Sequence, residues 1–387
     1  MIASPDLPAW DYVVIGAGSA GCALAGRLSE NPANRVLLVE AGGWDFSPYI
    51  HIPAAIIKAV GNPKLDWCYL AEPDPTRGGK IDLWPAGRVM GGGSSINGML
   101  YVRGAAHDFD AWAAQGCDGW SAADVLPVFK RMETFTGGNS RVRGQDGPLH
   151  VSYLRSRHPL ADVFIDAAQE RGLARNPDYN GSDQEGVSLP QVTQKTGRRF
   201  SAAQAYIWPV RNRPNLEIWT NAQCLRLAFD GKRCTGARVR RGGAEIEVQA
   251  RREVIVSAGA IASPKLLMLS GIGPAADLAR HGIAPVADLK GVGANLREHA
   301  EGMVSVDVRE RTYNVEINSP RIALHLLNWL LFRRGPATSP YPHAVAFFRS
   351  TPDKPKPDTQ AMLGPYAFSF SEAGIVPYLK PAVSAAV

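Results

Sequence analysis

The feature that most constrains the fold is a glycine-rich turn near the N-terminus, placed between two apolar runs. Residues 12–15 (Tyr-Val-Val-Ile) are typical of a buried parallel strand. Residues 16–21 (Gly-Ala-Gly-Ser-Ala-Gly) complete a G-x-G-x-x-G pattern, and the small residues of 20–29 predict a helix. Residues 35–39 predict a second strand that ends at Glu40. The order strand, glycines, helix, strand and acid predicts a βαβ unit that binds a dinucleotide.

Each residue of the turn has a physical role in that interpretation. Gly16 allows the tight turn, Gly18 and the adjoining Ser19 bring backbone close to a pyrophosphate, and Gly21 lets helix and strand pack. The helix N-terminus supplies N–H donors and a positive dipole end to the phosphates. Glu40 would accept hydrogen bonds from ribose hydroxyls and repel a 2′-phosphate, which disfavours NADP. The alternative is a glycine turn without a ligand. It is disfavoured because strand, glycines, helix and acid occur in the order of a dinucleotide site.

The rest of the chain favours FAD over NAD. A loop-rich stretch follows Glu40 to about residue 103, whereas an NAD dehydrogenase would continue with alternating strands and helices. Strands are expected at 216–220, 225–229, 236–240 and 245–249, and a further strand at 253–257 leads back to the parallel sheet. Helices are expected at 121–135 with Ser121 as N-cap, 159–171, 201–208, 322–332, and from Pro264 as a first helical position.

Composition excludes several classes of protein. The 387 residues carry a net charge of +6, and the basic residues are scattered, which does not indicate nucleic-acid binding. Five cysteines without a C-x-x-C predict neither disulfides nor a metal site. Residues 1–10 lack a signal pattern and 322–332 is too short to cross a bilayer, so we expect a soluble, cytoplasmic protein without a transmembrane segment. The apolar, strand-like residues 381–387 end without a polar tail, which suggests a truncated chain.

Two further glycine-containing segments suit a cofactor site. Residues 87–104 (GRVMGGGSSINGMLYVRG) offer many N–H groups for a phosphate or an isoalloxazine ring. A flexible linker is the alternative, but it would lack interleaved apolar residues such as Met90 and Met99. Residues 257–274 (SAGAIASPKLLMLSGIGP) read as a strand and a helix, which is compatible with a cofactor contact at Gly259.

These segments resemble the signatures of the glucose–methanol–choline (GMC) oxidoreductase family, in its choline-dehydrogenase-like and alcohol dehydrogenase subgroup. Residues 291–299 (GVGANLREH) and 199–206 (RFSAAQAY) resemble two more family segments. The resemblance implies an α/β fold with an FAD-binding, Rossmann-like domain and β meander at 10–150 and 176–305. A smaller, incomplete α+β substrate domain would comprise 151–175 and 306–387, with the C-terminal catalytic part missing.

The resemblance also implies a function. It is FAD-dependent oxidation of the CH–OH group of an alcohol, with hydride transfer to the flavin and a quinone, a carrier or oxygen as acceptor. The alcohol could be choline-like, aliphatic or aromatic. A truncated, non-catalytic FAD-binding fragment and an FAD-containing lyase relative remain as alternatives.

The site residues follow from the same resemblance. The adenosine end of FAD would contact Gly16, Gly18, Gly21 and Glu40, and the flavin end would contact Met90, Gly91, Ser94, Asn97 and Gly98. Gln223 and Cys224 would meet the adenine, with Ala258 and Gly259 close by. Some relatives bind FAD covalently through a histidine after the paired serines. Ile96 occupies that position here, so non-covalent FAD is expected.

The catalytic base is expected beyond Val387, because in the family it comes from the C-terminal region. The histidines of this chain are not assigned to that role. His107 and His150 lie in polar, turn-like contexts, His299 is in a structural family segment, His325 is on an apolar helical face where core packing is expected, and His343 is in a loop.

Overall fold

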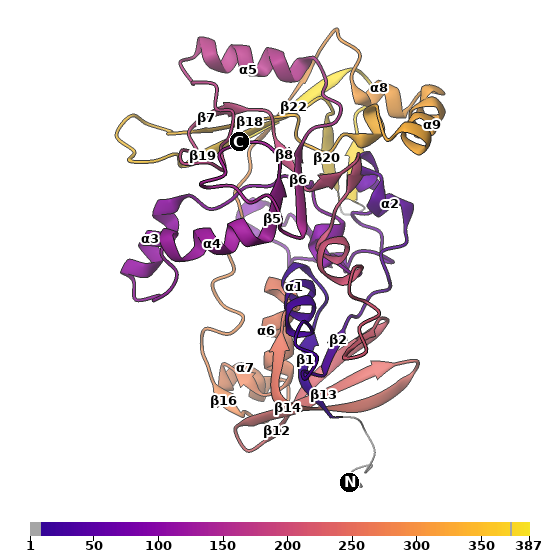
Figure 1. Cartoon of the computed structure of the whole chain (residues 1–387), viewed down its shortest axis with the longest axis vertical. Coiled ribbons are helices and arrows are strands. Elements are labelled where there is room, and N and C mark those ends of the chain that lie inside the picture. The colour runs from indigo at the N-terminus through magenta and orange to yellow at the C-terminus, as the bar shows by residue number, and fades with distance from the viewer. Residues whose placement is uncertain (1–8, 372–373) are drawn as a thin grey trace.

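The computed structural model describes residues 9–371 and 374–387. A six-stranded sheet with the order β11-β2-β1-β14-β13-β12 forms the lower half of the molecule in Figure 1. Its central strand β1 pairs in parallel with β2 and β14, and helix α1 connects β1 to β2, which confirms the βαβ unit. The bounds are β1 Trp10–Ile15, α1 Ser19–Leu28, β2 Val36–Val39, β11 Leu216–Trp219, β12 Ala222–Asp230, β13 Arg233–Arg241 and β14 Ala244–Val256.

Strand β14 joins the β meander to the parallel sheet. Residues 244–249 pair antiparallel with β13, and residues 253–256 pair in parallel with β1. The expectation of two separate strands at 245–249 and 253–257 is therefore wrong. One continuous strand changes its partner where the register with β1 shifts, between the pairs of Trp10 and Tyr12. The local sequence does not indicate whether one strand ends there or continues, because the change of partner depends on strands that are distant in the sequence.

The core of this half lies on both faces of β1 and β2. Leu37, Val39 and Val13 pack against the meander strands and α6 (Gly259–Leu269). Leu38 and Val14 face the other side, where they pack with α1. Alternate side chains of a strand point to opposite faces, so a strand buried on both sides reads as a continuous apolar run. Cys22 is fully buried in the α1 packing, as expected for a small residue there.

A second, five-stranded sheet with the order β17-β22-β19-β18-β7 lies in the upper half of Figure 1. The C-terminal strand β22 lies between β17 and β19, so it is not an edge strand. Strand β7 falls in the segment 176–305 that was assigned to the FAD-binding domain, yet it pairs with β18 in this sheet. The other domain boundaries stay a prediction. The bounds are β7 Gly186–Ser188, β17 Met303–Asp307, β18 Ala344–Phe348, β19 Thr359–Gly364 and β22 Ala382–Ala386.

Short sheets and helices complete the structure. The small sheets comprise β3 Tyr69–Leu70 with β4 Leu83–Trp84, β5 Glu133–Phe135 with β6 Leu149–Tyr153 and β8 Gln191–Val192, β9 Gln194–Lys195 with β10 Arg198–Arg199, β15 Ile272–Gly273 with β16 Ala287–Asp288, and β20 Phe368–Ser371 with β21 Gly374–Pro377. The remaining helices are α2 Pro48–His51, α3 Ala106–Ala114, α4 Ala122–Met132, α5 Leu160–Glu170, α7 Ala275–Arg280, α8 Tyr313–Ile317 and α9 Arg321–Phe332, with short turns at Pro53–Lys58, Pro75–Arg77, Gly92–Ser95, Ala203–Ile207 and Pro336–Thr338.

Two expected helices differ from the structure. Ser121 caps α4, as predicted, and it forms a capping box with Asp124, but the helix ends at Met132. Residues 133–135 form β5 instead, because Glu133 turns inward to bind buried arginines. Helix α6 begins at Gly259, so Pro264 lies inside the helix and not at its first position. Among the described residues, no helix is long and apolar enough to cross a membrane.

Candidate cofactor site

The glycine turn leaves open space in front of α1. A Cβ atom on Gly16 would lie 2.6 Å from the carbonyl oxygen of Ser257, and one on Gly21 would lie 1.8 Å from the carbonyl oxygen of Gly16. Both positions therefore require glycine for packing. A Cβ on Gly18 would meet nothing closer than the Ser257 oxygen at 3.9 Å, and Gly18 has an ordinary φ of −74°. The absent side chain of Gly18 thus leaves a cradle that a ligand can occupy.

The N-terminus of α1 is suited to an anion. Gly18 is the N-cap residue of α1, so among the described residues no side chain caps this helix, and its first turn contains no acidic residue. Ser19 and Ala20 are exposed. The first N–H groups of a helix have no partner within it, and the dipole places positive charge there. A pyrophosphate satisfies both conditions, so the turn fits a dinucleotide.

Glu40 lies beside the same turn. Its carboxylate accepts hydrogen bonds from the backbone N–H of Ala17 and of Gly42, both at 2.8 Å. Burial raises the pKa of Glu40, while these backbone donors and the charge of Arg88 oppose the shift. Each carboxylate oxygen keeps further acceptor capacity. The side chain is therefore fixed at the end of β2, where it can accept from ribose hydroxyls.

The second glycine segment packs directly on the first. The N–H of Gly91 donates to the carbonyl of Ala17 at 2.7 Å, and a Cβ on Gly92 would lie 2.6 Å from the Cα of Gly18. Met90 is fully buried against the α1 side of the core. The structure thus brings together two motifs that lie about 70 residues apart in the sequence.

Arg199 holds this second segment in place, a role that the sequence analysis missed. Its Nη1 donates to the Ser94 carbonyl at 3.1 Å and to Asn97 Oδ1 at 2.8 Å, and its Nε donates to the Ile50 carbonyl at 2.9 Å. Burial lowers the pKa of Arg199 to about 9. Within the described part of the chain its Nη2 is buried without a partner. The residue opens the segment 199–206, whose resemblance to the family was its only signal in the sequence.

Ser94 and Gly98 are fixed by other neighbours. The hydroxyl of Ser94 accepts from the N–H of Ala202 at 2.9 Å. A Cβ on Gly98 would lie 2.8 Å from the Tyr341 carbonyl, so glycine permits this close approach. The predicted flavin-side residues therefore share one rigid segment, with Asn97 exposed at its end.

The residues predicted near the adenine lie at the start of β12. The loop after Glu40 reaches this strand, because the N–H groups of Asn221 and Ala222 donate to the carbonyls of Gly42 and Glu40, both at 2.8 Å. Gln223 is exposed. Burial raises the pKa of the Cys224 thiol to about 12, so this thiol stays protonated at neutral pH.

Ala258 and Gly259 lie at the glycine turn. The Cα of Ala258 would be 2.8 Å from a Cβ on Gly16. Gly259 is exposed, and a Cβ there would meet no atom within 4 Å. The fourteen predicted cofactor residues therefore come from segments that converge on the carboxyl ends of β1 and β2, although their contacts with a cofactor stay a prediction.

Three histidines, His107, His150 and His325, lie in other surroundings than expected. His107 is in helix α3 and not in a turn. His150 is in strand β6, where its Nδ1 is 2.8 Å from the Gln194 carbonyl. His325 is not packed in a core, because its Nε2 is 2.8 Å from Glu316 Oε2. His343 lies in a loop, as predicted, and burial lowers its pKa to about 3. In residues 9–371 and 374–387, no group of three or more His, Cys, Asp or Glu side chains could hold a metal ion.

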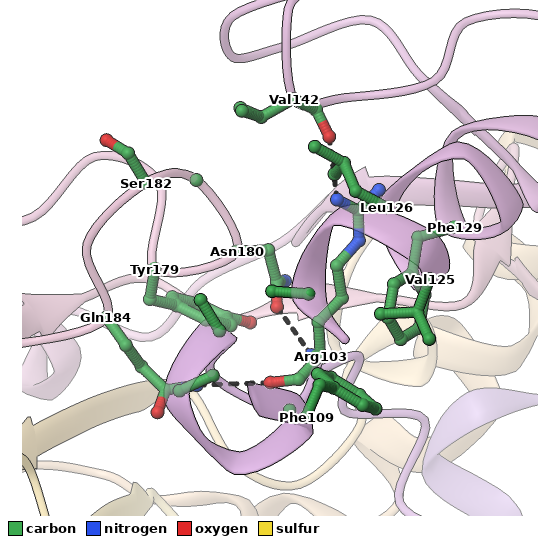
Figure 2. Close-up of a pocket in the computed structure, with 15 residues that line it drawn as sticks. Arg103, Phe109, Val125, Leu126, Phe129, Val142, Tyr179, Asn180, Ser182 and Gln184 are labelled. Atoms are coloured by element: carbon green, nitrogen blue, oxygen red, sulfur yellow. Dashed lines mark hydrogen bonds between the residues drawn. The ribbon is translucent and has the colours of Figure 1, made fainter. Parts of the chain in front are cut away.

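A separate cavity of about 180 Å³ lies between α3, α4 and residues 179–184, as Figure 2 shows. Phe109 and Phe129 line one side, and Asn180 and Gln184 lie opposite. The Arg103 backbone N–H donates to Asn180 Oδ1 at 2.7 Å, which fixes the polar side. The cavity is lined by none of the predicted cofactor residues, so it is distinct from the glycine turn.

Comparison with known proteins gives consistent matches. The sequence pattern of the GMC oxidoreductase family matches residues 10–301. The oxygen-dependent choline dehydrogenase of Sinorhizobium medicae is 44% identical over 373 residues, which is 93% of this chain and 66% of that protein. The corresponding enzyme of Brucella suis is 43% identical over 361 residues, with the same shares covered. The chain thus spans about two thirds of the length of these curated relatives.

Solved structures resemble the whole fold. Pyridoxine 4-oxidase from Mesorbium loti superposes with a TM-score of 0.82 at 30% identity, over 97% of this chain and 70% of that one. A formate oxidase structure superposes with a TM-score of 0.88 at 26% identity, over 99% of this chain and 73% of that one.

Proposed function

The chain belongs to the GMC oxidoreductase family, and we propose that it holds FAD at the glycine turn and serves the oxidation of the CH–OH group of an alcohol. Its fold is the FAD-binding fold of that family. The observation that carries the proposal is the space that the absent Gly18 side chain leaves in front of the uncapped N-terminus of α1. The second glycine segment packs beside this space.

Each part of the site has a task in this proposal. The first N–H groups of α1 bind the pyrophosphate, and Gly18 leaves room for its oxygens. Glu40 accepts from the ribose hydroxyls, and its orientation is set by the bonds from Ala17 and Gly42. Arg199 fixes residues 94–97 next to the flavin end, so that the ring has one position. FAD supplies the hydride acceptor when it is bound.

Ile96 supports non-covalent binding. It is buried in a small apolar cluster with Ile50 and Val89, and it offers no nucleophile to the flavin. We also propose that the electrons pass from the flavin to an acceptor other than a nicotinamide. A quinone, a carrier and oxygen are equally compatible with the site. A cytoplasmic location is also part of it, and is supported by five free cysteines, because thiols persist in reducing compartments.

Choline is the first substrate candidate. The relatives named choline dehydrogenases match 93% of this chain at 42–45% identity. The structural neighbours are named for pyridoxine and formate, so aromatic and small aliphatic alcohols belong in the same assay. That all these relatives are oxidoreductases favours alcohol oxidation over the non-catalytic alternative.

The test is anaerobic reduction of the FAD-loaded protein. Choline, an aliphatic alcohol and an aromatic alcohol are added separately, and the visible absorbance of the flavin is followed. The proposal predicts bleaching by one alcohol and none by the matching methyl ether, which lacks the hydroxyl proton. Full FAD occupancy without bleaching by any alcohol would contradict oxidation by this chain and would support the non-catalytic alternative, in which the base expected beyond Val387 is absent, while leaving FAD binding intact.

A further inference from the structure

Helix α9 presents its apolar face outward. It lies next to α8 at the edge of the molecule, at the upper right of Figure 1. Its polar contacts are on the inner side, where Trp329 Nε1 donates to the Gly197 carbonyl at 2.8 Å and His325 binds Glu316. A surface helix ordinarily shows the reverse arrangement, with apolar residues inward and polar residues outward.

The outward face is continuous. With 3.6 residues per turn, five large apolar side chains fall within an arc of roughly 160° on the side away from Trp329. Their exposed fractions run from 41% to 65%. The five are Leu324, Leu326, Leu327, Leu330 and Leu331. A contiguous exposed apolar surface of this kind marks an interaction site.

Unpaired cations surround the C-terminal end of α9. The turn between β9 and β10 lies beneath the helix, and a Cβ on Gly197 would lie 2.5 Å from the Arg333 carbonyl and 3.1 Å from Arg155 Cδ. Lys195 and Arg198 flank this turn, and Arg334 follows Arg333, whose guanidinium stacks on the inner side against the Trp329 ring at 4.0 Å. In the described part of the chain, no carboxylate pairs with Arg155, Lys195, Arg198 or Arg334. Residues 317–334 contain no Asp or Glu.

We propose that α9 docks on the surface of a lipid bilayer that contains anionic phospholipids. The leucine face would lie at the boundary between headgroups and acyl chains, with the cation cluster (Arg155, Lys195, Arg198 and Arg334) next to the headgroup phosphates. At 12 residues the helix is too short to span the bilayer, so it lies in the plane of the interface.

Charge favours the bilayer over a second copy of the chain. An isologous contact places the same patch of both copies in one interface, which would bring the two cation clusters together. An anionic bilayer instead supplies the missing negative charge, and each cation near its surface strengthens binding by about fivefold. The apolar face and the cations then act on the same partner.

The test is flotation of the full chain with lipid vesicles, either purely zwitterionic or with anionic phosphatidylglycerol added. We expect binding to the anionic vesicles that weakens at high salt. Leu331→Glu should weaken it roughly tenfold or more, and Arg334→Gln about fivefold. Val163→Glu, at an equally exposed apolar position on α5, is the matched control and should leave binding unchanged.

Circular dichroism verifies that the variants fold, which is expected because Leu331 points away from the core. Failure of the parent chain to bind either vesicle would overturn the proposal, and so would equal binding by Leu331→Glu. Light scattering distinguishes the other occupant. A dimer that Leu331→Glu dissociates, without any vesicle binding, would assign the face to a second copy.

Discussion

Alanine at Gly18 should weaken FAD binding and leave stability nearly unchanged, whereas alanine at Gly21 should destabilise the fold. At Gly18 the new methyl group meets no atom closer than 3.9 Å, and the backbone φ of −74° suits alanine. Alanine is a poorer N-cap than glycine, but it also lowers the entropy of the unfolded chain, so stability should change by less than about 1 kcal/mol. At Gly21 the methyl group would lie 1.8 Å from the Gly16 carbonyl, which should cost about 3 kcal/mol or more.

Binding of FAD should separate the two roles. The Gly18→Ala methyl group fills the cradle that the pyrophosphate requires, at a cost of about 1–3 kcal/mol, or roughly 5- to 150-fold in Kd. Urea unfolding measures the first quantity, and quenching of flavin fluorescence during titration measures the second. A Gly18→Ala protein that unfolds normally and binds FAD as tightly as the parent would refute the placement of the pyrophosphate at this turn.

Three further changes test other parts of the account. Arg199→Lys should lower stability by about 3 kcal/mol and weaken FAD binding, because one ammonium cannot replace three directed bonds to Ile50, Ser94 and Asn97. An unchanged Kd for FAD in the flavin titration would contradict the positioning role of Arg199. The folded-state pKa of His343, about 3, lies below its unfolded value of 6.5, so the unfolded state binds the proton first and stability falls as pH drops below 6.5. Between pH 7 and pH 5 the parent should therefore lose about 2 kcal/mol more than His343→Asn in urea unfolding, and parallel losses would exclude this residue as the cause. Glu133→Gln should lower the stability by about 3–5 kcal/mol, because Arg103 would stay buried without a carboxylate and Arg143 would keep only Asp178, while FAD affinity of the folded protein stays the same.

Local sequence sufficed for the parts of the fold that depend on neighbouring residues. The βαβ unit follows from two apolar runs and a glycine turn, and the capping box of α4 follows from Ser121 and Asp124. These features depend on hydrogen bonds and steric limits within a few residues, so their pattern is visible in any short window.

The features that the sequence did not reveal depend on distant partners. Strand β14 remains one strand because β1 continues its pairing where β13 ends. Glu133 leaves the helix because Arg103 and Arg143 lie beside it in space. Arg199 holds Ser94 across 105 residues of chain. The local sequence at these positions does not indicate which distant residue each of them will contact.

The candidate site divides in the same way. The glycines and Glu40 were predictable because the backbone geometry of the turn requires them in order. The apposition of Gly92 and Gly18 was not, since it depends on how the loop after Glu40 folds back over α1. Assignment of the remaining cofactor residues depended on resemblance to a family and not on local pattern.

The most direct measurement is the amount and attachment of flavin on the purified chain. The protein is saturated with FAD, passed through a desalting column, and then precipitated with acid. The account predicts one FAD per chain after the column, all of it released into the acid supernatant because Ile96 offers no covalent link. A chain that retains no flavin at FAD saturation would contradict the central claim that the glycine turn and its covering segment form an FAD site.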